Sequence, residues 1–125
     1  MAMVSFDSFD LTDGVPIYLQ IITYLKRGMI AGTVRHADEL PSRRVLSARL
    51  GVNPNTVQKA YRMLEEEGLI ESRTGAKSCI ALTPETMRRV REELLEHDAR
   101  KIVSALAQMG LSKADALALI DKHWQ

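Results

Sequence analysis

Four side chains that can donate hydrogen bonds recur three or four residues apart in the middle of the chain: Asn55, Gln58, Lys59 and Arg62. On a helix, this spacing places them on one face. Amides can read base edges in the major groove of DNA, and cations neutralise phosphates. The pattern therefore favours a nucleic-acid-binding face. An isolated helix with this pattern is more often simply solvated, so the flanking elements must decide between the two interpretations.

Two short helices joined by a tight turn are predicted to hold this face. Ser42 can cap a helix over residues Arg43 to Leu50, and Gly51 suits the position just past its end. Asn53 can cap the second helix. Pro54 fits the first position of that helix, where the N–H has no partner to lose. Only three residues separate the two helices, which is the signature of a helix-turn-helix.

The second helix also has an inward face and a charge pattern that suits DNA. Its apolar residues recur at helical spacing and are predicted to form core: Val57, Ala60, Tyr61 and Leu64. From Leu40 to Leu64 there is no acidic residue, but there are five cations: Arg43, Arg44, Arg49, Lys59 and Arg62. Three glutamates then follow, at 65 to 67, and they would repel phosphate. We therefore expect the Asn53 end of this helix to point toward DNA.

A basic hairpin is predicted next. Gly68 ends the helix, and two apolar runs, Leu69–Ile70 and Cys79–Leu82, flank the segment from Arg73 to Lys77. A plain surface hairpin would show the same pattern. Because a turn-linked helix pair precedes it, we interpret the hairpin as a wing whose tip approaches a phosphate or the minor groove. The predicted fold class is mainly α with a small β-hairpin wing: a winged helix-turn-helix.

This stretch resembles the winged-helix domain of GntR-type bacterial transcription regulators. The matching residues are Val15-Pro16-Ile17-Tyr18 with Gln20, the continuous run from Leu40 to Tyr61, then Leu64 and Glu67-Gly68-Leu69-Ile70. The resemblance covers roughly residues 14 to 82, over a long and specific motif. The short remaining chain further resembles the YtrA-like subgroup, whose members lack a large effector domain. The resemblance implies a DNA-binding regulator that works as a dimer.

The resemblance and the charge pattern together predict the DNA-binding residues. Arg44 resembles the family arginine that contacts DNA from the preceding helix, and Thr56, Arg73, Thr74 and Gly75 match other contact positions. At the start of the recognition helix we expect Asn55, Thr56 and Gln58 near base edges, with Asn and Gln suited to adenine. Asn53, the cap of that helix, is also expected among the DNA-binding residues. Arg43 is expected at a phosphate. We add Lys59, Arg62 and Lys77 to the predicted DNA-binding residues because of their positive charge alone.

Two departures from the family pattern bear on specificity. Pro54 and Gln58 stand where much of the family has arginine, so the family's guanine contacts are expected to be absent. The target sequence should therefore differ from that of the arginine-bearing members. The dipeptide Ala76-Lys77 also replaces a more glycine-rich wing tip, which changes the expected contact there.

The first part of the chain is predicted to contribute an arm and one core helix. Residues 1–14 form either an arm that docks through Phe6, Phe9 and Leu11 or a frayed end. A helix is expected from Pro16 to Ala31, with a buried stripe of Ile17, Ile21, Ile22, Leu25 and Met29. His36 is expected at the surface of the following loop. Ala37 stands where the family usually has glycine, so a differently shaped turn is expected.

A two-helix tail is predicted over residues 84–125, after a winged domain over residues 15–83. Thr83 can cap a helix from Pro84 to about Met109, Gly110 breaks it, and Ser112 caps a last helix. Such a tail cannot bury its apolar stripe alone. We expect it to pair with a second copy, rather than only with its own domain, through Leu94, Leu95, Ile102, Leu106, Leu117, Ile120 and Trp124.

Composition excludes several classes of protein. The formal net charge is +1 and the hydrophobic share is 46%, as in an ordinary globular chain. The single cysteine, Cys79, forms no internal disulfide, and residues 1–14 do not resemble a signal peptide. No apolar run is long enough to span a bilayer. We therefore expect a cytoplasmic protein with no cofactor, no metal site and no membrane partner.

The sequence is thus interpreted as a sequence-specific DNA-binding regulator. We expect a dimeric repressor of a neighbouring operon that binds double-stranded DNA at an inverted repeat. The alternative is a winged helix used only for protein contacts. An enzyme is not expected, because no nucleophile elbow, phosphate loop or Cys/His cluster is present. A small-molecule effector is neither predicted nor assigned residues.

Overall fold

The computed structural model describes residues 2–73 and 77–125. Its elements follow the chain in the order α1 (Ile17–Ala31), α2 (Arg43–Leu50), α3 (Pro54–Glu66), β1 (Ile70–Arg73), β2 (Lys77–Ile80), α4 (Pro84–Gln108) and α5 (Lys113–His123). Two compact units result, Met1–Val90 and Arg91–Gln125, which we call the head and the tail. Helix α4 begins in the head and continues in the tail. The prediction of a mainly α fold with a small hairpin is confirmed.

The helix-turn-helix has the predicted caps. The Ser42 hydroxyl accepts a hydrogen bond from the Val45 N–H at 3.1 Å. Gly51 ends α2 in the left-handed conformation, at φ +70°. The Asn53 side chain then accepts from the Asn55 N–H at 2.8 Å, with Pro54 opening α3. Each cap satisfies a helix-terminal N–H that has no partner within the helix, so this short sequence specifies both helix starts.

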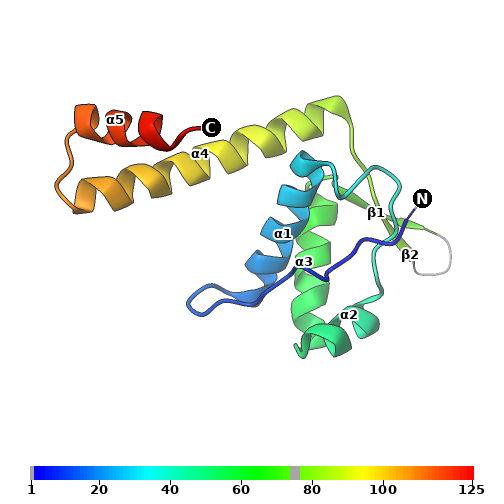
Figure 1. Ribbon diagram of the computed structural model, residues 1–125. Coiled ribbons are helices and arrows are strands. Elements are labelled where there is room, and N and C mark those ends of the chain that lie inside the picture. Colours follow the sequence, from blue (N-terminus) through cyan, green and yellow to red (C-terminus); the bar gives the residue numbers. More distant parts are fainter. Residues whose placement is uncertain (1, 74–76) are drawn as a thin grey trace. The chain divides into compact units, whose positions relative to one another are not determined.

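The core of the head lies where α1 and α2 pack on α3 (Figure 1). The predicted inward face of α3 is buried: Val57, Ala60, Tyr61 and Leu64. The α1 stripe meets it through Ile21, Ile22, Leu25 and Met29, whereas Ile17 is only half-buried. Helix α1 begins at Ile17 rather than at the expected Pro16, because Pro16 occupies the N-cap position.

The hairpin is confirmed, but its strands are shifted toward the tip. Strands β1 and β2 are antiparallel, with Ile70 opposite Ile80 and Arg73 opposite Lys77. The apolar runs had placed Leu69 and Leu82 inside the strands. Instead, the Leu69 N–H donates to the Leu64 carbonyl at 2.9 Å, and the Leu82 N–H donates to Nδ1 of His36 at 2.9 Å. These backbone groups are therefore used to anchor the hairpin ends.

The described part of the arm, residues 2–14, docks on the head. Val4 and Phe6 are buried, and Met3 forms a parallel bridge with Glu39. The Phe6 ring stacks on Tyr24 of α1, with ring centroids 5.1 Å apart. Of the two expectations for the arm, docking is the one observed. Phe9 also contacts Tyr24 and Thr12 is hydrogen-bonded to Gln20 of α1, whereas Leu11 is exposed.

The turn after α1 holds an alanine, Ala37, in a left-handed conformation. Ala37 has φ +73°, the one positive value for a non-glycine residue in the described chain. Its N–H donates to the Ile80 carbonyl at 2.8 Å, which ties the turn to β2. The left-handed conformation costs alanine about 1–2 kcal/mol, which the anchored turn must offset.

The tail has the predicted helices but no buried side chain of its own. The Thr83 hydroxyl accepts from the Thr86 N–H at 3.1 Å at the start of α4, and the Ser112 hydroxyl accepts from the Asp115 N–H at 3.1 Å at the start of α5. From Arg91 to Gln125 every residue is exposed or half-buried. No single helix in the described residues is long and apolar enough to cross a membrane, although α4 and α5 taken as one bent pair pass that test.

Candidate nucleic-acid interface

The N-termini of α2 and α3 form the core of the candidate interface. Neither first turn contains an acidic residue, so the positive ends of both helix dipoles are left uncompensated within the turn. The caps at Ser42 and Asn53 hold the backbone in place. Exposed N–H groups and a favourable dipole are what a phosphate oxygen requires. This part of the surface is therefore suited to contact a polyanion.

The predicted side chains of these helices lie at the surface. Those exposed are Arg43, Arg44, Asn53, Asn55, Lys59 and Arg62, and those half-buried are Thr56 and Gln58. The opposite side of α3 is core, so packing fixes which way the polar face points. The tight turn after Gly51 brings the cations at the start of α2 close to this face.

Arg43 and Gln58 are in direct contact, which the sequence did not predict. The Arg43 guanidinium, on the first residue of α2, donates a hydrogen bond to the amide oxygen of Gln58 on α3. An arginine has only donors, so the oxygen of the amide, not its nitrogen, must face Arg43. The residue expected at a phosphate is thus coupled to the residue expected at a base.

Two cations of the acid-free stretch from Leu40 to Leu64 have partners outside that stretch. The Lys59 ammonium lies 4.0 Å from the centroid of the Tyr18 ring, a cation–π contact with α1. Arg49 is paired with Asp7 of the arm, 42 positions away. No acidic residue lies near Arg49 in the sequence, but the fold places the Asp7 carboxylate beside it. No local signal could have revealed either pair.

The wing cations face each other across the hairpin. Arg73 and Lys77 are the last register pair before the tip, and both are exposed. Like charges directly opposite repel, and each has a carboxylate nearby: Glu71 at 3.1 Å from Arg73 and Glu39 at 3.7 Å from Lys77. A phosphate between the two cations would relieve the repulsion. The predicted contacts at Thr74 and Gly75 fall outside the described residues.

The acidic end of α3 is tied into the head. Glu67 accepts from the ammonium of Lys26, a buried side chain on α1, at 3.0 Å. The Glu65 carboxylate accepts from the Ser72 hydroxyl at 2.8 Å. These carboxylates therefore serve the packing of α3 against α1 and β1, at the end opposite to the Asn53 cap.

A buried tyrosine holds α3 against the segment leading into α2. The Tyr61 hydroxyl donates to the Pro41 carbonyl at 2.7 Å. Burial raises the pKa of the Tyr61 phenol well above its usual value, so the group remains a neutral donor. This bond lies one turn from Gln58 and links α3 to the segment that leads into α2.

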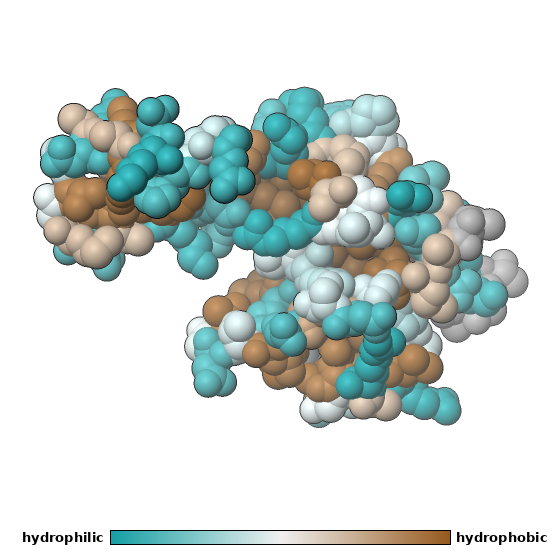
Figure 2. Space-filling view, in the orientation of Figure 1, coloured by the Kyte–Doolittle hydropathy of each residue, from teal (hydrophilic) through white to brown (hydrophobic). Residues whose placement is uncertain are grey.

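The predicted dimerisation residues form a second candidate surface, on the tail. Leu94 and Leu106 are half-buried, and the others are exposed: Leu95, Ile102, Leu117, Ile120 and Trp124. Trp124 is 78% exposed. Figure 2 shows apolar side chains gathered on the part of the surface formed by α4 and α5. Apolar patches of this kind are typical of protein–protein contacts.

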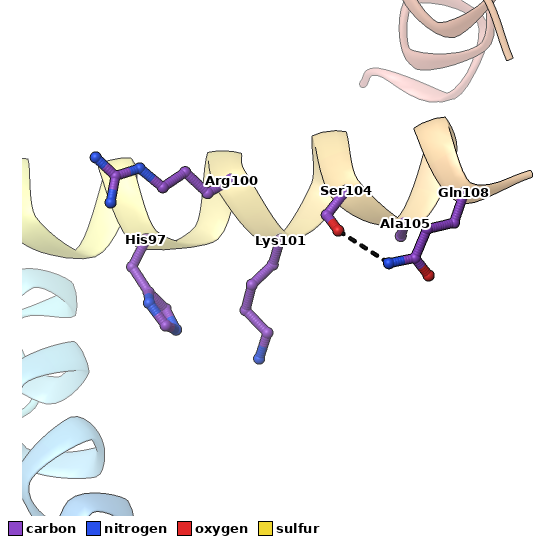
Figure 3. Close-up of a pocket in the computed structure, with 6 residues that line it drawn as sticks. All are labelled: His97, Arg100, Lys101, Ser104, Ala105 and Gln108. Atoms are coloured by element: carbon purple, nitrogen blue, oxygen red, sulfur yellow. Dashed lines mark hydrogen bonds between the residues drawn. The ribbon is translucent and has the colours of Figure 1, made fainter. Parts of the chain in front are cut away.

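A different flank of α4 is polar. It is lined by His97, Arg100, Lys101, Ser104, Ala105 and Gln108, which project along one helix (Figure 3). The Gln108 amide donates to the Ser104 hydroxyl at 3.2 Å. All six residues are exposed and come from a single element, so this hollow is an open helix flank rather than a ligand pocket. Within the described residues, no cluster of His, Cys, Asp and Glu could hold a metal ion.

Comparison with known proteins gives a consistent result. The family profile for bacterial regulatory proteins of the gntR family matches residues 17–78. A Bacillus subtilis protein named as an HTH-type transcriptional regulator, YhcF, is 31% identical to this chain. The match covers 82% of this chain and 84% of YhcF. The B. subtilis transcriptional repressor YtrA is 42% identical over 62% of this chain and 59% of its own length.

A solved structure matches nearly the whole chain. A GntR family transcriptional regulator from Listeria monocytogenes superposes with a TM-score of 0.78 at 28% identity. The match covers 91% of this chain and all of the other. The similarity therefore extends beyond the helix-turn-helix into the tail.

Proposed function

Since the chain belongs to the GntR family of bacterial regulatory proteins, we propose that it is a homodimeric repressor that binds an inverted-repeat operator. It is a transcription regulator with a DNA-binding helix-turn-helix, and not an enzyme. The proposal concerns its assembly, its contact residues and the sign of its regulation.

The observation that carries the proposal is the pair of acid-free helix N-termini, at Arg43 and Pro54, set beside the exposed polar face of α3. In this proposal α3 enters the major groove. Asn55, Thr56 and Gln58 lie near bases there, since recognition helices present their N-terminal residues to base edges. Arg43, Arg44, Lys59 and Arg62 neutralise phosphates, and the wing supplies Arg73 and Lys77.

The dimer is supported by the tail. Its exposed apolar residues have no core of their own, and an unpaired stripe of this kind favours association with an identical stripe. A twofold dimer would present two α3 helices, and the half-sites of an inverted repeat would lie about one helical turn apart. Such a dimer bound over a promoter would exclude polymerase. We extend the repressor role from the name of YtrA and propose a neighbouring operon as the target.

The test is a selection of random genomic fragments by the purified chain, followed by sequencing. A recurring inverted repeat is expected, and Gln58→Ala should change the preference at one symmetric pair of positions. Binding should weaken steeply with salt, because each neutralised phosphate releases counterions. Fragments with no common sequence, or binding by a monomer that is insensitive to salt, would contradict the proposal.

The alternative, a winged helix used only for protein contacts, makes the opposite prediction. The double variant Arg44→Ala, Gln58→Ala would then change no DNA affinity, because there would be none. Under the proposal, the same variant loses most of its affinity for the selected operator while the fold is retained, since neither side chain is buried.

A further inference from the structure

We propose that Arg43 sets the base preference of Gln58, so that this pair reads guanine rather than adenine. The inference rests on the proposed function, because it concerns the base contacts of that same interface. It replaces two expectations from the sequence: that Gln58 suits adenine, and that guanine contacts are absent. The observation behind it is the hydrogen bond from the Arg43 guanidinium to the Gln58 amide oxygen.

The contact changes what the glutamine can offer to DNA. A glutamine that recognises adenine uses both ends of its amide: the oxygen accepts from N6 and the nitrogen donates to N7. In this chain the oxygen already accepts from Arg43, and the hydrogen bonds of the described residues include none from the Gln58 nitrogen. The amide therefore presents donors. The second lone pair of the oxygen lies beside a cation, where the amino group of adenine would be repelled.

The arginine adds donors to the same place. A guanidinium has five N–H groups in a rigid fork, and the bond to Gln58 uses one of them. Guanine presents two neighbouring acceptors in the major groove, N7 and O6, and no other base edge there presents two acceptors side by side. A surface that combines the Gln58 amide nitrogen with the Arg43 guanidinium matches that edge. Arg43 is thus a positioning residue for Gln58 as well as a cation near the backbone.

Caps hold the two backbone positions that carry this contact. It is the first residue of α2, directly after the Ser42 cap, and Gln58 lies on the second turn of α3, whose start is fixed by Asn53. The Tyr61–Pro41 hydrogen bond holds α3 to the segment that leads into α2. Both backbones are therefore set before DNA binds, and only the two side chains need to be ordered.

Binding-site selection on four proteins tests the inference. The wild type gives the operator, and Gln58→Ala identifies the symmetric pair of positions that Gln58 reads. At those positions the wild type should prefer guanine. Arg43→Met removes the donor to the amide oxygen and frees it to accept. We expect this variant to change the ratio of guanine to adenine affinity by about tenfold, in favour of adenine.

Arg44→Met is the matched control, because it removes the neighbouring cation from the same helix without touching the Gln58 amide. It should weaken operator binding and leave the base choice at the Gln58 positions unchanged. An adenine preference in the wild type or an unchanged preference in Arg43→Met would each overturn the inference alone. If Gln58→Ala altered no position, the inference would fail together with the base contact proposed for Gln58. If the wild type selected no common sequence, the proposed function would fail as well.

Discussion

The head and the tail use the same kinds of apolar residue in opposite ways. In the head, leucines and isoleucines such as Leu25, Leu64 and Ile80 are fully buried by residues of the same chain. In the tail, Leu95, Ile102 and Leu117 are each more than half exposed, and no residue from Arg91 onward is buried. The head therefore encloses its own hydrophobic core, whereas the tail does not.

The difference shows that an apolar stripe does not specify its own partner. The stripes of α1 and α3 satisfy each other because these two helices pack directly against each other in the head. The stripes of α4 and α5 follow the same helical period, but two helices cannot enclose a core. The candidate DNA-binding surface therefore lies on a self-sufficient unit, whereas the proposed dimer depends on the protein concentration.

The largest expected effect comes from replacing a leucine by alanine in the head and comparing it with the same replacement in the tail. Leu64→Ala should destabilise the head by about 3 kcal/mol, since Leu64 is fully buried and its removal leaves a cavity. Leu117→Ala should leave the unfolding of the head unchanged and weaken self-association instead. Denaturant unfolding at several protein concentrations separates the two. A loss from Leu117→Ala that is equally large at every dilution would mean that the tail has a core within one chain.

A charge placed on the tail stripe should break the dimer and spare the head. Ile102→Lys would bury an ammonium in the proposed interface, so we expect the dissociation constant of the dimer to rise at least about 100-fold. Sedimentation equilibrium measures it. Gln108→Lys adds the same charge to the polar flank of α4 and serves as the matched control. Equal dissociation by both variants would place the interface elsewhere.

Removing the Tyr61 hydroxyl should have a smaller effect, confined to the head. Tyr61→Phe loses the hydrogen bond to Pro41 and should lower the free energy of unfolding by about 1 kcal/mol at neutral pH. Chemical denaturation measures the change. An equal change in a chain that lacks residues 91–125 would show that the bond belongs to the head alone. A change in the full chain several times larger than in the shortened chain would mean that the bond also supports the tail.

The same residue predicts how the stability of the head depends on pH. The pKa of Tyr61 is raised in the folded state, so its contribution is complete below the unfolded pKa of about 10 and decreases above it, as the unfolded state loses the proton first. Wild type should therefore lose stability above pH 10 more steeply than Tyr61→Phe. Parallel curves for the two proteins would contradict the assigned burial of the phenol.

The smallest expected effect is a gain. Ala37→Gly relieves a left-handed conformation but adds chain entropy to the unfolded state, so we expect a net stabilisation of up to about 1 kcal/mol. Thermal unfolding measures it in the head. DNA affinity should not change, because Ala37 lies in the turn that is bonded to β2. Destabilisation would mean that the turn does not strain alanine.

Much of the fold could be predicted because its signals are local. Ser42, Gly51, Asn53 and Pro54 mark the two helix boundaries through backbone groups a few residues away, and each behaves as expected. Strand limits were less well predicted, since Leu69 and Leu82 use their N–H groups outside the ladder. Those partners come from α3 and from the His36 loop, which strand propensity does not register.

The sequence by itself determined the helix-turn-helix, the hairpin, the polar face of α3 and the apolar stripe of the tail, because periodicity and caps act over a few residues. Only the tertiary structure decided which side chains meet. It coupled Arg43 to Gln58, placed Lys59 on Tyr18 and gave Arg49 an acid from the arm. These partners are far apart along the chain, so packing of the helices, and no local pattern, determines which donors remain for DNA.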